Sequence, residues 1–194
     1  NKELKPMLKD SNNPKSVFSP LVRFYTLDNQ GNCWLTSTRG IYKLSFFPHT
    51  YNLVHIDNGF ETRAFLCDNE KRLWVSSKAQ MIRVYQPDGQ LEGYLTPQGK
   101  ISKDKQSFTS VYCFLEDHEG NIWIGTNNGL SCYHPTENRF TNYTKQDGLP
   151  DTQFYWNASC HSSDGTLYFG TVAGLTAIES NFPPSIIQPA NVRF

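Results

Sequence analysis

The sequence lacks a long apolar run and an excess of charge of either sign. No stretch approaches the roughly 20 apolar residues of a membrane helix, and the N-terminus has no signal-peptide apolar region. Because the chain begins with Asn1, we expect it to be an excised or processed piece of a longer protein. Its 18 Lys and Arg residues balance 18 Asp and Glu residues, which argues against a basic nucleic-acid surface. We therefore expect no nucleic-acid partner.

Paired cysteines and metal-ligand spacings are also missing. The five cysteines are odd in number, and none has C-x-x-C spacing. They are Cys33, Cys67, Cys113, Cys132 and Cys160. The five histidines show no spacing such as H-E-x-x-H. We expect no disulfide framework, no metal site and no cofactor, and we expect the cysteines to be small buried hydrophobic side chains.

What the sequence does contain is an internal repeat, found in four copies that align without a gap over seventeen positions. The copies are Asp28–Leu44, Asp68–Val84, Asp117–Tyr133 and Ser162–Ile178. Their aromatic anchors, Trp34, Trp74, Trp123 and Tyr168, are 40, 49 and 45 residues apart. No long segment has a helical period, which disfavours helical repeats. A period of about 40–50 residues is typical of propellers.

Turn chemistry divides each copy into short strands. In the third copy, Asp117-x-x-Gly120 predicts a turn between strands 111–116 and 122–126, and Gly129 a turn before strand 130–134. A fourth strand is expected at 140–143. Four strands per repeat indicate an all-β fold of four four-stranded blades, a partial β-propeller. The second copy has Lys71 and Gln80 in place of the two glycines.

These boundaries predict a lead-in segment over residues 1–19 and four blades at about 20–57, 58–98, 107–146 and 151–180. An exit linker covers 181–194. The last blade has no evident fourth strand, because Pro183-Pro184 interrupts the chain and removes backbone donors. An insertion before the third blade, residues 99–106, carries three lysines and is expected to be a solvated loop, although these lysines could also meet an anionic sugar.

The third copy carries a resemblance. Its run Gly120-Asn-Ile-Trp-Ile-Gly-Thr-x-x-Gly-Leu130, followed by Asp147-Gly-Leu-Pro150, resembles the two-component regulator propeller repeat of Bacteroidetes hybrid two-component systems. The resemblance implies a periplasmic module that senses an oligosaccharide and signals to a histidine kinase that regulates polysaccharide utilisation. It also implies a β-sandwich and a membrane helix downstream, so any membrane contact is expected through that helix alone.

Ligand-facing loops of a propeller enter the innermost strand or join its second and third strands. Mapped onto the repeat, these loops contain the candidate ligand-binding residues Trp156, Tyr155, Asn157, Arg63, Arg39 and Asn127. Sugar rings present C–H faces and hydroxyls, so their sites combine flat aromatic faces with planar hydrogen-bonding groups. Trp156 alone among the tryptophans lies outside the repeat's anchor position. Packing within the blade is the alternative interpretation of Trp156.

An enzymatic function is not indicated, and no catalytic residue is predicted. The carboxylates Asp28, Asp68 and Asp117 recur at one repeat position, which indicates a turn role instead of an acid–base pair. No G-x-S-x-G motif occurs. A protein-interaction scaffold and a propeller lyase or glycosidase remain alternatives. Four blades alone would leave apolar faces exposed, so we expect this chain to form a homodimer that closes a pseudo-ring.

Overall fold

The computed structural model describes residues 22–28, 30–37, 40–47, 50–58, 61–179 and 188–189. These residues form four antiparallel sheets and one 3-10 turn, Lys145–Asp147, so the chain is all-β and consists of four β-propeller blades. None of them belongs to a helix of the length and apolarity that a membrane crossing needs. The chain divides into two units, residues 1–62 and 63–194, which are described separately.

The first unit contains one blade of four strands in sequential order. Its strands are β1 (Val22–Leu27), β2 (Cys33–Ser37), β3 (Gly40–Phe47) and β4 (Thr50–Asn58). Leu35, Tyr42 and Leu44 form its small core. An added Cβ at Gly40 would lie 1.8 Å from the Asp57 carbonyl oxygen, so the turn between β2 and β3 requires glycine.

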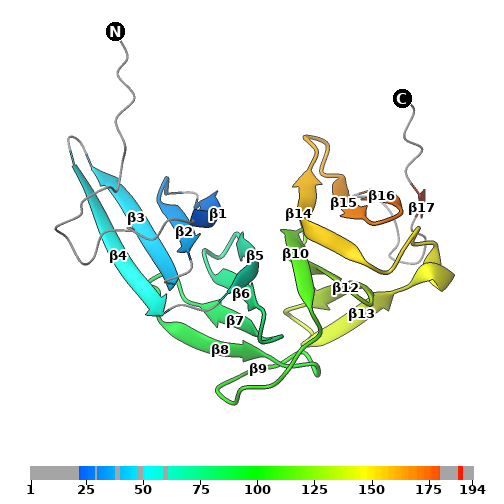
Figure 1. Cartoon of the computed structure of the whole chain (residues 1–194), viewed down its shortest axis with the longest axis horizontal. Helices are drawn as coiled ribbons and strands as arrows, with labels where there is room; N and C mark the ends of the chain where they lie inside the picture. Colours follow the sequence, from blue (N-terminus) through cyan, green and yellow to red (C-terminus); the bar gives the residue numbers. More distant parts are fainter. Residues whose placement is uncertain are drawn as a thin grey trace, which may run out of the picture. The chain divides into compact units, whose positions relative to one another are not determined.

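The second unit contains three blades, each built from consecutive antiparallel strands (Figure 1). Blade two comprises β5 (Thr62–Cys67), β6 (Leu73–Ser77), β7 (Ile82–Tyr85), β8 (Leu91–Leu95) and β9 (Ile101–Ser102). Blade three comprises β10 (Val111–Glu116), β11 (Ile122–Thr126), β12 (Gly129–His134) and β13 (Arg139–Tyr143). Blade four comprises β14 (Phe154–His161), β15 (Leu167–Thr171), β16 (Gly174–Ile178) and β17 (Gln188–Pro189). The four strands predicted in the third copy are thereby confirmed.

Left-handed turns recur at the two positions where the repeat places glycine. The positions are Gly31, Lys71, Gly120 and Gly165 in the first turn, and Gly40, Gln80, Gly129 and Gly174 in the second. Lys71 and Gln80 take φ of 67° and 55° although they are not glycines. The second copy therefore keeps the backbone of the repeat after losing both glycines.

Each repeat Asp accepts a hydrogen bond from the anchor Trp six residues later. The Nε1 atoms of Trp34, Trp74 and Trp123 donate to these carboxylates over 3.2, 2.8 and 2.8 Å. The same carboxylates also accept backbone N–H groups of their turns. Burial alone would raise the pKa of Asp28, but hydrogen bonds from Asn32, Trp34 and Gln30 lower it. The recurring Asp is thus a turn residue that also orients the anchor indole.

Apolar layers fill the space between neighbouring blades of the second unit. Trp74 and Ile82 of blade two pack with Ile124 and Tyr133 of blade three, and the rings of Trp74 and Tyr133 are 5.8 Å apart. On the other side of blade three, Trp123 belongs to a cluster that includes Phe154 and Phe169 of blade four. Trp74 and Trp123 therefore fill inter-blade layers of the second unit, as blades buried on both faces require.

Two cysteines are confirmed as buried, and one prediction about cysteine is wrong. Cys113 and Cys132 lie in the layer between blades three and four, and burial raises the pKa of Cys113 to about 12. Cys33 and Cys67 are half-buried. Cys160 is exposed. The adjacent Ser159 faces blade three, where its hydroxyl meets the Phe114 carbonyl oxygen, so alternation along β14 turns Cys160 away.

Two further expectations about strands are wrong. The segment after Gly99 is no simple loop, because Ile101–Ser102 pairs with Tyr94–Leu95 as a fifth strand of blade two. The last blade has a fourth strand, since Gln188–Pro189 pairs with β16 beyond the proline pair. Pro183 and Pro184 themselves lie outside the described residues. Proline is tolerated in such an edge strand.

Candidate functional site

The innermost strands of blades three and four contain bulges of different size. In β10, Tyr112 and Cys113, of which Cys113 pairs with Gly125, lie between Val111, which pairs with Thr126, and Phe114, which pairs with Ile124. In β14, the four residues 155–158 lie between the equivalent pairs of Phe154 and Ser159. The bulge of β14 is thus longer by two residues. Such bulges redirect side chains and are frequent beside binding sites.

The longer bulge turns two aromatic side chains outward. Tyr155 and Trp156 are 62% and 57% exposed, whereas most aromatic residues of the blades are buried. Asn157 has a left-handed backbone with φ 52°, a conformation that Asn adopts more readily than most residues. The interpretation of Trp156 as a residue packed within its blade is therefore not supported by its position.

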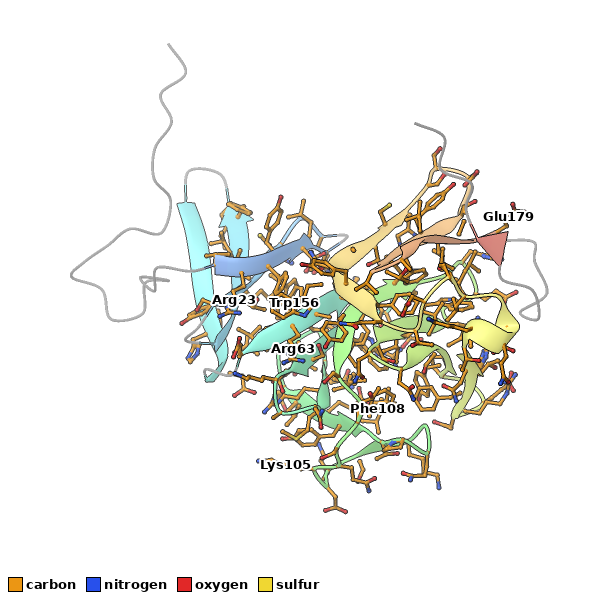
Figure 2. All side chains as sticks on the ribbon, turned by 45° about the vertical axis from the view of Figure 1, so that its right-hand side comes forward. Arg23, Arg63, Lys105, Phe108, Trp156 and Glu179 are labelled. Atoms are coloured by element: carbon orange, nitrogen blue, oxygen red, sulfur yellow. The ribbon has the colours of Figure 1, made fainter. Side chains whose placement is uncertain are left out.

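Three blades of the second unit contribute to one side-chain cluster around Tyr112, which we call the platform: Arg63, Tyr112 and Trp156. The Tyr112 and Trp156 rings are stacked, with centroids 6.4 Å apart and planes inclined by 16°. The Arg63 guanidinium carbon lies 5.7 Å from the Tyr112 ring centroid. Figure 2 shows the labelled Arg63 and Trp156, which come from β5 and β14. The platform offers a flat aromatic surface beside a cation with hydrogen-bond donors.

The other sequence-predicted residues lie elsewhere. Asn127, in the turn between β11 and β12, accepts a hydrogen bond from the Thr109 hydroxyl over 2.7 Å, and its N–H donates to the Ser110 carbonyl over 3.2 Å. The start of β10 and the β11–β12 turn are therefore adjacent, as the loop mapping requires. Arg39 lies outside the described residues. Tyr112, central to the platform, was not among the sequence candidates.

Metal-binding clusters are not found in the described part of the chain. No group of three or more His, Cys, Asp or Glu side chains there could hold a metal ion. The repeat carboxylates lie in separate blades, each bonded within its own turn. His134 is held between Asn121 and Thr141, at 2.9 and 3.0 Å, within blade three. These contacts assign structural roles to the residues concerned.

The lysines of the insertion do not form a joint cationic site. Lys103 Nζ donates to the Leu91 carbonyl oxygen over 3.1 Å, which ties it to β8. Lys100 lines a separate groove between blades two and three, together with Arg72 and Glu92. Lys105 is exposed and points outward in Figure 2. Their arrangement favours the solvated interpretation over a site for an anionic sugar.

The chain is similar in sequence to a curated protein. Histidine kinase P4 of Formosa agariphila is 24% identical over 210 residues, an alignment that takes in 96% of this chain and 14% of that protein. The chain therefore spans a small part of this curated relative.

Solved structures share the fold at low sequence identity. One is the extracellular domain of a protein described as a hybrid two-component system from B. thetaiotaomicron, with TM-score 0.61 and 19% identity, over 89% of this chain and 22% of that chain. A second extracellular domain from this organism, also described as a hybrid two-component system, has TM-score 0.52 and 22% identity over 82% and 28%. Virginiamycin B lyase from Staphylococcus aureus has TM-score 0.62 and 11% identity over 92% and 59%.

A family model matches the chain directly. Residues 105–128 match the two-component regulator propeller, and this range ends within the third repeat copy, which carries the resemblance in the sequence. The match includes β10 and β11, the strands that hold Tyr112 and the anchor Trp123. The chain is accordingly a set of β-propeller blades in which residues 105–128 match the two-component regulator propeller.

Proposed function

We propose that this chain is a ligand-recognising segment of the periplasmic propeller of a hybrid two-component sensor. In this proposal it binds an oligosaccharide, and a histidine kinase of the same protein reports the occupancy and regulates polysaccharide utilisation. The match to the two-component regulator propeller and the similarity to a histidine kinase support the sensor role. Two solved structures with this fold are extracellular domains, which supports the proposed periplasmic location.

The observation that carries oligosaccharide recognition is the platform. An exposed indole stacked on a tyrosine can cover the C–H face of a sugar ring, while the Arg63 guanidinium can donate to its hydroxyls. Tyr155 extends the exposed aromatic surface. A bound ligand would remove the apolar surface of these rings from water, which favours binding.

The test is Trp156→Ala in the whole protein as its gene encodes it. A glycan array first identifies an oligosaccharide that binds, and calorimetry then compares the two proteins. We expect Trp156→Ala to weaken binding by about 1–3 kcal/mol, the scale of one aromatic contact. The unfolding midpoint should stay unchanged because the side chain is 57% exposed.

A matched control is Phe47→Ala in the first unit, since Phe47 is 55% exposed and lies outside the platform. It should leave affinity unchanged. Unchanged affinity of a folded Trp156→Ala protein would exclude Trp156 from the site. Turnover of the bound oligosaccharide, followed by mass spectrometry, would favour the lyase or glycosidase alternative, and absence of glycan binding would favour a protein-interaction scaffold.

A further inference from the structure

A second concave site lies on the side of blade three that faces blade two. It is a groove of about 360 Å³, which we call the neutral groove. Every side chain that lines it is uncharged, and two are aromatic. The residues that matter for its chemistry are Phe108, Thr109, Asn128, Phe140, Asn142 and Thr144. Its volume falls at the lower end of the range for small-molecule sites.

Strand alternation explains why polar and aromatic groups gather there. Along β12, Leu130 and Cys132 face blade four and join its apolar layer. Ser131 therefore faces blade two and lies opposite Asn142 of β13. The Phe108 and Phe140 rings, 5.6 Å apart, form the apolar part of the groove. The groove is thus a gap in the layer between blades two and three, with hydrogen-bonding groups in place of core side chains.

The groove offers unused hydrogen-bonding groups. The Ser131 hydroxyl donates to Asn142 Oδ1 over 2.7 Å, which leaves the Asn142 amide N–H groups for another acceptor. Asn128 uses its backbone N–H, which donates to Thr126, but not its side-chain amide. Within the described residues neither free amide group has a partner. Amide donors and acceptors beside aromatic rings suit sugar hydroxyls and C–H faces.

The charge of the groove lining favours uncharged sugars over anionic ones. Among the residues that the structure describes, no cation lines the groove, and the one charge bonded to its lining is negative. The Asp147 carboxylate accepts the N–H and the hydroxyl of Thr144, over 2.8 and 3.0 Å. A carboxylate or sulfate on a bound sugar would therefore meet repulsion and no compensating partner.

The groove and the platform are on the same axial side of the blades. Thr109 lines the groove and Tyr112 lies in the platform, three residues apart at the start of β10. Their Cα atoms are thus at most about 11 Å apart. Trp156, likewise, is near the start of β14. One oligosaccharide can reach both sites from this side.

We propose that the neutral groove is a second saccharide subsite that takes an uncharged sugar residue of the oligosaccharide stacked on the platform. The inference rests on the proposed function and adds the ligand class: the ligand contains at least one sugar without a carboxylate or sulfate. Asn128 and Asn142 bind its hydroxyls, and Phe108 and Phe140 contact its C–H groups.

The experiment uses the whole protein and an array of oligosaccharides in two sets, one with neutral sugars and one with a uronate or sulfate on every residue. Wild type should bind members of the first set and not of the second. Asn128→Ala and Asn142→Ala should each weaken binding about tenfold, the scale of a lost hydrogen bond with its partner left unpaired. Asn142→Asp, which adds a charge at the same shape, should weaken binding further.

The matched control is Gln90→Ala, since Gln90 is exposed in the β7–β8 turn, outside both sites. It should bind like wild type, and all four variants should keep the wild-type unfolding midpoint. If both asparagine-to-alanine variants bind like wild type while Trp156→Ala does not, the groove is not a subsite and the proposed function stands. Binding of only the fully charged set also refutes the subsite. If wild type binds no oligosaccharide, both proposals fail.

Discussion

Trp123→Ala tests whether the anchor tryptophans hold the blades together. Trp123 is 5% exposed, and its ring stacks on Tyr143 with centroids 5.6 Å apart. Its cluster joins side chains of blade three to Phe154 and Phe169 of blade four. Removal of the indole therefore leaves a cavity between two blades, which a rigid sheet pair can close only in part.

The expected loss of unfolding free energy is about 3–5 kcal/mol, the range for a buried large aromatic residue replaced by alanine. The lost hydrogen bond adds little, because Asp117 still accepts the N–H groups of Glu119 and Asn121 and the Asn121 side-chain amide. Trp123→Phe is a milder change at the same position. It keeps a phenyl ring in the layer but loses the second ring and the Nε1 donor, so a loss of about 1–2 kcal/mol is expected.

The assay is urea unfolding followed by circular dichroism, since fluorescence would change with the tryptophan content. Trp156→Ala serves as the control, because its exposed side chain should change stability by less than about 0.5 kcal/mol. A Trp123→Ala protein within about 0.5 kcal/mol of wild type would refute the assignment of Trp123 to a well-packed inter-blade layer.

Three further predictions concern charge, repeat equivalence and assembly. Burial, with Asp68 and Asp117 nearby, raises the pKa of Glu116 from 4.5 to about 7, so its contribution to stability is full below pH 4.5 and is lost as pH rises through 7. Glu116→Gln should remove this loss, measured as the difference in unfolding free energy between pH 5 and pH 7.5 in urea unfolding. An equal difference in the wild-type and variant proteins would contradict the prediction. In blade four, Ser162→Asp combined with Tyr168→Trp should restore the missing Asp–Trp hydrogen bond. A double-mutant cycle should then give a favourable coupling free energy of about 0.5–3 kcal/mol, and a coupling of zero would count against the prediction. Exposed Tyr25 and Leu27 on β1 support self-association of the isolated chain, for which light scattering should give twice 22.2 kDa; a stable monomer would end this proposal.

Regular turns explain why the strands of blade three could be predicted from the sequence. Asp-x-x-Gly and the second glycine fix both hairpins, so register follows from the turn and the apolar pattern. The left-handed backbone at Lys71 and Gln80 was not predicted, because neither side chain favours it. The Asp–Trp hydrogen bond was missed, since its geometry depends on how far the turn folds back over the strand.

The platform could be predicted only in part. Arg63 and Trp156 follow from loop mapping, but Tyr112 does not, because it lies in a bulge within β10 and not in a loop. The signal that could have indicated Tyr112 is the difference in bulge length between β14 and β10. A gapless alignment that starts at the repeat Asp does not include these innermost strands. The strands β9 and β17 were missed because each pairs through only two residues, too few for a periodic pattern.

Departures from the repeat point to function more directly than the repeat itself. In the second unit the shared positions form turns and inter-blade layers, so turn geometry and packing account for them. The two extra residues of the β14 bulge break a ladder, place Asn157 in a left-handed conformation and leave Tyr155 and Trp156 exposed. A left-handed backbone at a residue other than glycine and apolar rings left in water both carry a cost in free energy. We propose that a ligand covering the exposed rings offsets this cost, and for this reason we assign the proposed recognition to this side of blades three and four.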